Sequence, residues 1–312
     1  MLERFPTIEA MLLARQPLAP VYCVHPAIYR RSTQQFLHGF PGRVLYAVKA
    51  NNDPAVLQEL LDAGVCHFDC ASLSEVELIR GLSTDATCYF MTPVRLPGDA
   101  RDAYQKFACR HFMIDHQSGL SPLLDEIEAA DCVIFARMAV HHASALEDLS
   151  SKFGAPPADT PDLLAAIASS GAEAALAFNV GSGVRDPAGY QHALTVAADV
   201  LERTTISVRL LDIGGGFPLS YPDFGVPPLS EYFAAIKHDT GKLPLADNFE
   251  LLAEPGRALA APGMSTVTRV LLRKDNRLYI NDGMYGGFWE LRFDGHKRYA
   301  VNAFRDGACL QG

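Results

Sequence analysis

The stretch RVLYAVKAN, residues 43–51, decides the fold. Its apolar run has the length and the β-branched and aromatic content of a buried strand. The segment that follows, DPAVLQELLDAG (53–64), is amphipathic with a helical period and opens at Asp53, a residue type that favours helix starts. A strand followed directly by a helix is the repeating unit of a parallel sheet.

The same alternation continues to residue 255. Amphipathic stretches such as SLSEVELIRGL (72–82), TPDLLAAIASSG (160–171) and LSEYFAAIKHDTG (229–241) separate the apolar runs. Eight such units in a chain of 312 residues predict an α/β fold of the closed (β/α)8 (TIM) barrel type rather than an open doubly wound sheet. The eight predicted strands cover residues 43–50, 67–72, 87–91, 111–115, 132–140, 174–180, 207–215 and 249–255.

Strand-like segments also lie on both sides of the barrel in the sequence. VYCV (21–24) precedes it, and TVTRVLLRK, RLYIND and RYAVNAF follow it, which predicts a small β-domain built from both ends of the chain. We expect an N-terminal segment of the β-domain (1–42), the barrel (43–262) and a C-terminal portion of the β-domain (263–312).

Composition narrows the class of function. A net charge of -9 with basic residues spread along the chain argues against a nucleic-acid surface, so small molecules are the expected partners. Seven cysteines without a C-x-x-C pair or a His/Cys cluster at zinc spacing indicate reduced thiols and no metal site. The first twenty residues do not resemble a signal peptide, and no apolar run is long enough to cross a bilayer. We therefore expect a cytoplasmic protein without membrane contacts.

Candidate chemistry lies where barrel strands end, since the C-terminal ends of the strands form the functional face of such barrels. Lys49 ends the first strand, and a Schiff-base lysine would need a partly desolvated amine or a lowered pKa. The alternative is a solvated lysine at the rim. Glycines 214–216 suit a phosphate cradle or a flexible turn, and Glu254 with Arg257 suits either a cofactor contact or an ion-paired turn.

Seven motifs occur in an order that resembles the ornithine, diaminopimelate and arginine decarboxylase family, group IV or fold type III, with the ornithine decarboxylase-like enzymes most similar. The resemblance implies an alanine-racemase-type barrel with an added β-domain and pyridoxal 5'-phosphate as cofactor. The motifs are YAVKAN, FDCAS, SKFG, VGSG, LDIGGGFP, AEPGR and NDGMYG, within roughly residues 20–296.

Roles for single residues follow from this resemblance. Lys49 would form the Schiff base, Glu254 would meet the pyridine nitrogen, and Asp69 with Arg137 would order the phenolic side of the cofactor. Ser182, the three glycines and Arg257 would surround the phosphate. The full set of implied cofactor contacts is Lys49, Asp69, Arg137, Asn179, Ser182, Gly214, Gly215, Gly216, Glu254, Gly256, Arg257 and Tyr285.

The implied reaction is decarboxylation through a quinonoid intermediate. A carboxylate at the ring nitrogen keeps it protonated and makes the ring an electron sink, whereas the similar alanine racemases place an arginine there. Asp294 resembles the family aspartate that receives the distal ammonium of a basic substrate, and Tyr285 would also contact the substrate. Ornithine or lysine is therefore the expected substrate. The alternative for Asp294 is a surface turn.

Two features depart from the family pattern. Asn179 stands where relatives have a histidine that stacks on the cofactor, although His141 and His142 lie nearby in the sequence. The chain also ends at AFRDGACLQG without the family's G-P-x-C-D-x-x-D segment, and Cys309 is a poor replacement for the proton-donating cysteine of that segment. A truncated gene, a partner chain that supplies the segment, or a changed function would each explain this.

Three hypotheses for function remain open at this stage. The first is an active decarboxylase, and the second is an impaired or non-catalytic homologue that binds the cofactor or a protein partner. The third and weakest is a racemase or another lyase that uses the same cofactor. A homodimer is expected, since SKFG (151–154) resembles the motif whose lysine, here Lys152, forms a salt bridge across the family's dimer interface.

Overall fold

The computed structural model describes residues 3–141, 152–222, 225–292 and 298–310. Contacts divide the chain into a larger unit, formed by residues 26–219 and 226–262, and a smaller unit, formed by residues 1–25, 220–225 and 263–312. The predicted boundary after residue 42 falls instead after His25. The reason is that helix α2 (Pro26–Gly39) packs against helices of the larger unit.

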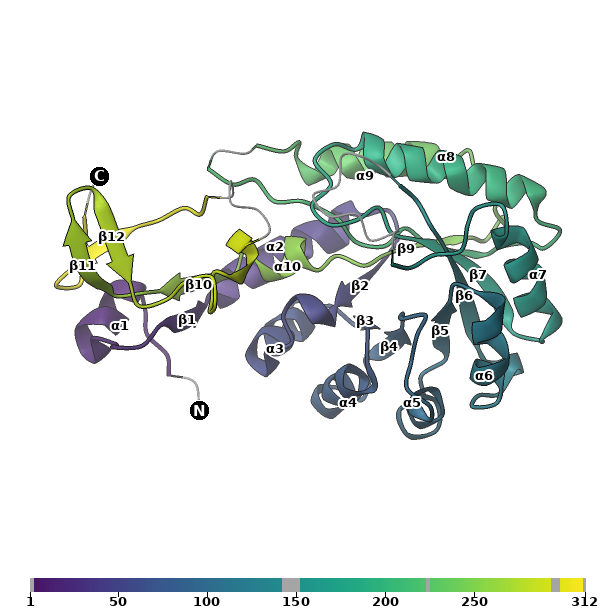
Figure 1. Ribbon diagram of the computed structural model, residues 1–312, viewed down its shortest axis with the longest axis horizontal. Coiled ribbons are helices and arrows are strands. Elements are labelled where there is room, and N and C mark those ends of the chain that lie inside the picture. The colour runs from purple at the N-terminus through teal and green to yellow at the C-terminus, as the bar shows by residue number, and fades with distance from the viewer. Residues whose placement is uncertain (1–2, 142–151, 223–224, 293–297, 311–312) are drawn as a thin grey trace. The chain divides into compact units, whose positions relative to one another are not determined.

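The larger unit is a closed barrel of eight parallel strands in sequential order, which confirms the predicted fold class. Its helices lie outside the strands (Figure 1). The strands are β2 (Arg43–Ala47), β3 (His67–Cys70), β4 (Thr87–Phe90), β5 (His111–Ile114), β6 (Val133–Met138), β7 (Glu173–Phe178), β8 (Leu210–Asp212) and β9 (Glu250–Ala253). The helices besides α2 are α3 (Pro54–Asp62), α4 (Leu73–Leu82), α5 (Asp99–Phe107), α6 (Leu120–Leu124), α7 (Thr160–Ser169), α8 (Ala188–Arg203), α9 (Leu229–Thr240) and α10 (Arg257–Ala260).

Large apolar side chains fill the inside of the barrel. Residues from different strands, such as Leu45, Phe135 and Leu252, form one buried cluster. Every second residue of a strand points into the barrel. The inward-pointing residues above and below this cluster therefore lie near the two ends of the strands. The core therefore closes the middle of the barrel and leaves its two ends to polar residues.

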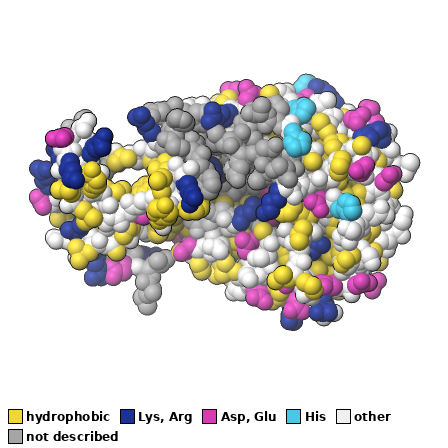
Figure 2. All heavy atoms as spheres, in the orientation of Figure 1, with side chains coloured by type: hydrophobic (Ala, Val, Ile, Leu, Met, Phe, Trp, Pro, Cys, Tyr) yellow, Lys and Arg dark blue, Asp and Glu magenta, His cyan; other side chains and the backbone are white. Residues whose placement is uncertain are grey.

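The smaller unit carries the predicted β-domain as two-stranded antiparallel sheets. Val21–Val24 (β1) pairs with Met264–Val267 (β10), which joins the two ends of the chain as expected. The remaining strands form hairpins, and hydrophobic side chains of β11 and β12 are exposed, as Figure 2 shows at the surface of this unit. Its other elements are α1 (Ile8–Arg15), β11 (Val270–Lys274), β12 (Arg277–Ile280), η4 (Trp289–Arg292), β13 (Ala303–Arg305) and β14 (Ala308–Leu310).

No helix in the described part of the chain is both long and apolar enough to cross a bilayer.

Candidate active site

Charged side chains gather at the C-terminal end of the barrel. Lys49 lies in a short 3-10 helix, η1 (Val48–Ala50), that directly follows β2. Asp69 belongs to β3 and Arg137 to β6, while Glu254 follows β9 at once. Since all eight strands are parallel, their C-terminal ends share one end of the barrel, and these side chains influence one another electrostatically.

An ion pair joins Lys49 to Asp69, with 2.9 Å between Nζ and Oδ2. The Asp69 side chain is 1% exposed and the Lys49 side chain is 56% exposed, although protein atoms surround the amine densely. The negative charge of Asp69, followed by that of Glu254, raises the pKa of Lys49 against the opposing effects of burial and Arg137. A buried carboxylate thus holds the ammonium form of Lys49, so the lysine meets the condition of a lowered pKa only once this charge is compensated.

Buried carboxyl groups surround this pair. Glu254 is 7% exposed and Asp212, the last residue of β8, is 1% exposed. Burial raises the pKa of Glu254, and the neighbouring charges of Asp212 and Asp69 raise it further. Among the described residues, no hydrogen-bond partner reaches Glu254 Oε1, Asp212 Oδ2 or Asp69 Oδ1. Buried oxygens without partners are costly, so their presence marks a place prepared for a polar ligand.

Glycines 214–216 form a tight turn after β8. Gly214 and Gly216 have φ angles of 68° and 98°, which disfavour any other residue. A Cβ atom at any of the three would come within 2.6 to 2.7 Å of a backbone oxygen of Phe178, Glu254 or Gly181. The close approach of these chain segments therefore requires glycine, and it leaves the backbone of the turn uncovered by side chains.

A second glycine loop, VGSG after β7, lies against the first. The N–H of Val184 donates to the carbonyl of Gly216 at 2.9 Å, and Gly181 and Gly183 have φ angles of 94° and 63°. Ser182 sits between these two glycines and is partly exposed. The two loops together form a backbone-lined cradle of the kind that binds phosphate groups.

Asn179 connects the two loops. Its Oδ1 accepts a hydrogen bond from the Gly181 N–H at 2.9 Å. Its Nδ2 lies close to the first loop, since a Cβ atom added to Gly214 would be 2.9 Å from it. The side chain is thus turned toward its own loop, so Asn179 supports the cradle and does not replace a stacking ring.

Gly256 and Arg257 follow Glu254 in the sequence. A Cβ on Gly256 would lie 2.8 Å from the Cβ of Ala50, so glycine allows this turn to pack against the Lys49 turn. Arg257 begins α10 directly beyond it. The lysine, the carboxylates and the glycine cradle therefore belong to adjoining loops of one barrel end.

The other predicted residues have varied surroundings. Tyr285 belongs to the smaller unit, where its side chain is 93% exposed. Asp294 and His142 lie outside the described residues. Lys152 lies over the ring of Phe153 at 4.8 Å, and Arg137 lies over the same ring at 5.4 Å. Cys309 is an exposed residue of β14.

Asp212 was not predicted as a site residue. It contacts the glycine turn directly, because its Oδ1 accepts the Gly214 N–H at 2.8 Å. The sequence does hold a signal, since an acidic residue ends the apolar run LL immediately before IGGG. No group of three His, Cys, Asp or Glu residues in the described ranges has the arrangement of a metal site.

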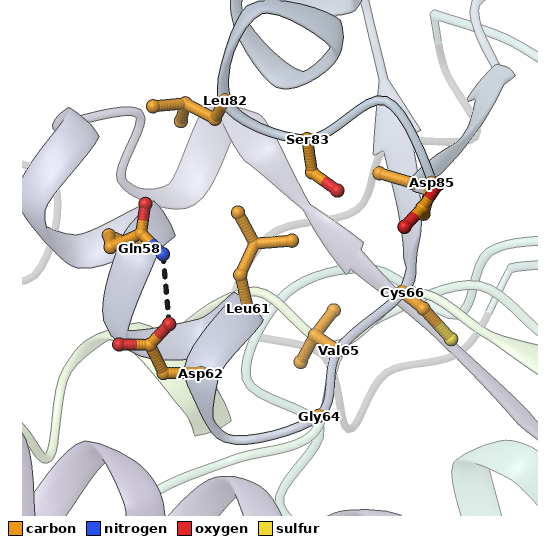
Figure 3. Close-up of a pocket in the computed structure, with 10 residues that line it drawn as sticks. Gln58, Leu61, Asp62, Gly64, Val65, Cys66, Leu82, Ser83 and Asp85 are labelled. Atoms are coloured by element: carbon orange, nitrogen blue, oxygen red, sulfur yellow. Dashed lines mark hydrogen bonds between the residues drawn. The ribbon is translucent and has the colours of Figure 1, made fainter.

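Two surface hollows lie at the opposite end of the barrel. One, of about 280 Å³, is lined by the turns that precede β3 and β4, including Asp62, Cys66 and Asp85 (Figure 3). In it, Gln58 donates a hydrogen bond to Asp62 at 2.8 Å. The other, of about 500 Å³, lies beside Arg43 and Glu250. Neither contains the lysine or the glycine turn, so we place the functional site at the C-terminal end.

Comparison with known proteins identifies the family. The family model described as the pyridoxal binding domain of pyridoxal-dependent decarboxylases matches residues 27–261, which include the barrel strands, Lys49 and the glycine turn. The chain belongs to the pyridoxal-dependent decarboxylase family. Pyridoxal phosphate is accordingly its cofactor.

Relatives in this family include proteins named decarboxylases and a protein named antizyme inhibitor 2. A lysine/ornithine decarboxylase of Selenomonas ruminantium is 34% identical over 275 residues, which cover 85% of this chain and 68% of that protein. Antizyme inhibitor 2 of Xenopus laevis is 29% identical over 296 residues, which cover 85% of this chain and 62% of that protein. The chain thus spans about two thirds of the length of these relatives.

A solved structure agrees with the barrel and with part of the smaller unit. The lysine/ornithine decarboxylase from Vibrio vulnificus, complexed with cadaverine, superimposes with a TM-score of 0.80 at 27% identity. The match covers 96% of this chain and 82% of that one. The family, the fold class and the cofactor predicted from the sequence are therefore confirmed.

The described residues fit this cofactor. A lysine amine stands at the C-terminal end of the barrel, and a glycine cradle offers backbone N–H groups where side chains cannot fit. The unpartnered oxygen of Glu254 offers an acceptor for a cationic ring nitrogen. Each of the three chemical parts of pyridoxal phosphate thus has a complementary group.

Proposed function

We propose that this chain uses pyridoxal phosphate bound through Lys49 to decarboxylate a basic amino acid, with ornithine or lysine as substrate. The observation that carries the proposal is the buried, unpartnered Glu254 carboxyl group beside the Lys49–Asp69 ion pair. The cofactor supplies an aldehyde that binds amines and a ring that withdraws electrons from the substrate α-carbon. The protein residues supply position and charge.

The phosphate end is assigned to the two glycine loops. Gly215 and Gly216 would present backbone N–H groups, Gly214 would shape the turn while its own N–H donates to Asp212, and Ser182 of the second loop would add its hydroxyl group. Arg257, placed by Gly256 next to the Lys49 turn, would add a positive charge. Asn179 would hold the second loop in shape through its bond to Gly181.

The reactive end is assigned to Lys49, Asp69 and Arg137. Asp69 holds the Lys49 amine at 2.9 Å and stabilises its proton, so the lysine is fixed in place before the cofactor enters. The amine must lose that proton to act as a nucleophile. Asp69 is the nearest acceptor, and Arg137 opposes the proton's return because its positive charge lowers the pKa of Lys49.

Glu254 determines the type of reaction. A carboxylate at the ring nitrogen favours electron withdrawal and therefore loss of carbon dioxide over racemisation. Burial makes this interaction strong, since it takes place away from water. The names of the relatives, lysine/ornithine decarboxylase among them, support a diamino acid as substrate. Contacts of Tyr285 and Asp294 with the substrate remain predictions.

We also propose a homodimer, because Lys152 of SKFG is described at the surface, where a partner subunit can reach it. Sedimentation of the purified protein should give twice the chain mass of 33.9 kDa. A mass that fits one chain would contradict the proposal, and co-purification of a different chain would indicate a heteromeric enzyme instead.

The decisive experiment is an absorbance spectrum with pyridoxal phosphate, before and after borohydride, followed by a carbon dioxide assay with ornithine, lysine, arginine and diaminopimelate. Lys49→Ala should lose the protein-bound absorbance band and all turnover. Lys106→Ala is the matched control, since Lys106 also pairs with an aspartate, Asp102, at 2.7 Å but lies on α5. A band that survives Lys49→Ala would overturn the assignment.

A second candidate is a cofactor-binding homologue without turnover. Two observations favour it: the relative named antizyme inhibitor 2, and Asn179, which turns toward its own loop. A Lys49-dependent band without carbon dioxide release from any basic amino acid would support this candidate over the decarboxylase.

A further inference from the structure

Asp212 is a buried acid to which the roles above assign nothing. It ends β8, is 1% exposed, and uses Oδ1 to accept the Gly214 N–H at 2.8 Å. Its second oxygen, Oδ2, has no hydrogen-bond donor in the described part of the chain. A carboxylate held in this way is strongly unfavourable unless a proton or a cation compensates it.

The neighbouring strand brings Glu254 to the same place. The Ile213 N–H donates to Leu252 at 3.0 Å, and the Glu254 N–H donates to Gly214 at 2.8 Å, so β8 and β9 stay paired past Asp212. Asp212 is opposite Leu252 in the register, and Glu254 is two residues further on the same strand face. The two carboxyl groups therefore lie at neighbouring strand ends on one face, and each raises or lowers the pKa of the other.

Two ionised carboxylates cannot form a hydrogen bond, because both are acceptors only. One proton between them would provide the donor that the unpartnered oxygens Asp212 Oδ2 and Glu254 Oε1 lack. The charges of the groups that face the pair also favour a single shared proton. Lys49 and Arg137 are two cations, and Asp69, Asp212 and Glu254 are three acids, so a single proton makes the group neutral.

We propose that Asp212 is a positioning residue that shares one proton with Glu254 and thereby fixes the carboxyl group that meets the cofactor ring. This inference rests on the proposed function of Glu254 and adds a second residue to it. Asp212 also ties the proton pair to the phosphate cradle through Gly214. The ring end and the phosphate end of the site are thus linked by one side chain.

Burial raises the pKa of both acids, in agreement with a retained proton. A folded-state pKa above the unfolded value means that the folded state keeps its proton more readily. The carboxyl pair should therefore contribute stability to the cofactor-free protein that is lost as the pH rises from the ordinary carboxyl range through the raised pKa. The free energy of unfolding of the wild type minus that of Asp212→Asn, measured at each pH, isolates this contribution, and a difference that does not shrink with rising pH would contradict the shared proton.

The direct test is infrared difference spectroscopy of the cofactor-free full chain at pH 7, with Asp212→Asn and Glu254→Gln beside the wild type. The wild type should show the carbonyl band of a protonated buried carboxyl group, and both variants should lose it. The band's absence from the wild type, or its persistence in either variant, would overturn the proposal. If one variant fails to fold, the spectrum of the other variant tests the proposal. Because the experiment uses cofactor-free protein, its result does not depend on whether Lys49 binds the cofactor.

A second measurement separates proton sharing from mere support of the turn. The amide that Asp212→Asn introduces can donate to an ionised Glu254 and still accept from Gly214, so this variant should keep cofactor affinity at pH 7 within about threefold. Asp212→Ala removes both bonds and should weaken affinity by roughly tenfold or more. Equal losses in the two variants would contradict the proposed role, because an amide would then fail to stand in for the protonated acid.

Discussion

The two ends of the barrel differ in how their carboxylates are paired. At the N-terminal end, Arg43 donates to the hydroxyl of Tyr89 at 2.8 Å and pairs with Glu250. Arg209 joins Glu250 to Glu173 at 3.1 and 2.8 Å. At the C-terminal end, buried carboxyl oxygens such as Glu254 Oε1 have no donor among the described residues. Charges at the first end thus satisfy one another, and those at the second are available to a ligand.

This contrast is expected for a barrel that carries out chemistry at one end only. Glu250 and Glu254 illustrate the contrast within one segment, since Glu250 begins strand β9 and Glu254 directly follows its last residue. Glu250 contributes to stability through two arginines, whereas Glu254 reduces stability in order to serve binding. Mutations at matched positions should therefore separate stability from activity.

The largest expected effect is that of Glu254→Gln on the reaction. A neutral amide does not hold the ring nitrogen in its protonated form, so the decarboxylation rate should fall by roughly 100-fold or more. The free energy of unfolding should not fall, because an amide is less costly to bury than an acid and can still donate a hydrogen bond to Asp212. Steady-state kinetics and urea unfolding measure the two quantities.

Glu250→Gln is the matched control for this variant. It should lower the free energy of unfolding by roughly 1 kcal/mol through its weakened arginine contacts and leave the rate per folded molecule unchanged. If Glu250→Gln reduced the rate as strongly as Glu254→Gln, the division of labour between the two ends would be refuted.

A second effect concerns acid stability at the N-terminal end. Burial and the charge of Arg43 lower the pKa of His111 to about 3, and its ring stacks on Tyr89 with centroids 3.9 Å apart. The unfolded chain takes up this proton near pH 6.5 and the folded chain does not, so the contribution of His111 to stability falls as the pH drops below 6.5. His111 alone should account for up to about 3 kcal/mol of the loss between pH 7 and pH 4.

His111→Phe keeps a ring against Tyr89 and removes the titration. The variant should lose correspondingly less stability than the wild type between pH 7 and pH 4, as measured by urea unfolding at each pH. His38→Phe, at an exposed position on α2, should leave the pH dependence unchanged. An unaltered pH dependence in His111→Phe would show that this histidine is not the acid-sensitive group.

The smallest effects concern two glycines. Gly216→Ala would place Cβ 2.6 Å from the Gly181 carbonyl at a φ of 98°, so it should cost about 1–2 kcal/mol and weaken cofactor binding. Gly81→Ala, in helix α4 with open space around it, should instead stabilise by about 0.5–1 kcal/mol. Thermal unfolding and cofactor titration of both variants measure these effects. Equal changes in stability and in cofactor affinity for Gly216→Ala and Gly81→Ala would contradict a rigid cradle.

The sequence predicts the barrel well, because each strand combines an apolar run with a flanking amphipathic helix. It predicts helices less completely. Helix α5, DARDAYQKF, is not among the predicted helices: Ala100, Ala103, Tyr104 and Phe107 do form an apolar stripe at helical spacing, but the stripe is narrow and the other five residues are polar or charged. In the smaller unit, TVTRVLLRK forms parts of two strands, β10 and β11, rather than one. Exposure on both faces of the β11–β12 hairpin removes the alternation on which strand prediction depends.

The candidate site is predictable in its parts and less so in its electrostatics. Lys49, the glycine turn and Glu254 were found because each ends or follows a strand, and parallel strands bring such residues to one end. The raised pKa of Lys49 and the contact between Asp212 and Glu254 depend on distances between strands far apart in the chain. The hairpin β13–β14, by contrast, had an unused local signal in Asp306-Gly307, a dipeptide typical of two-residue turns.

The pairing of β1 with β10 has a consequence for synthesis. Val24 pairs with Met264, 240 residues further along the chain. At translation rates of roughly 5–20 residues per second, β1 leaves the ribosome about 10–50 seconds before its partner strand exists. During that interval the nascent chain can form most of the barrel, but β1 remains an unpaired strand. Chaperones, and the β1 strands of neighbouring chains on the same messenger RNA, can bind it before its partner strand is synthesised.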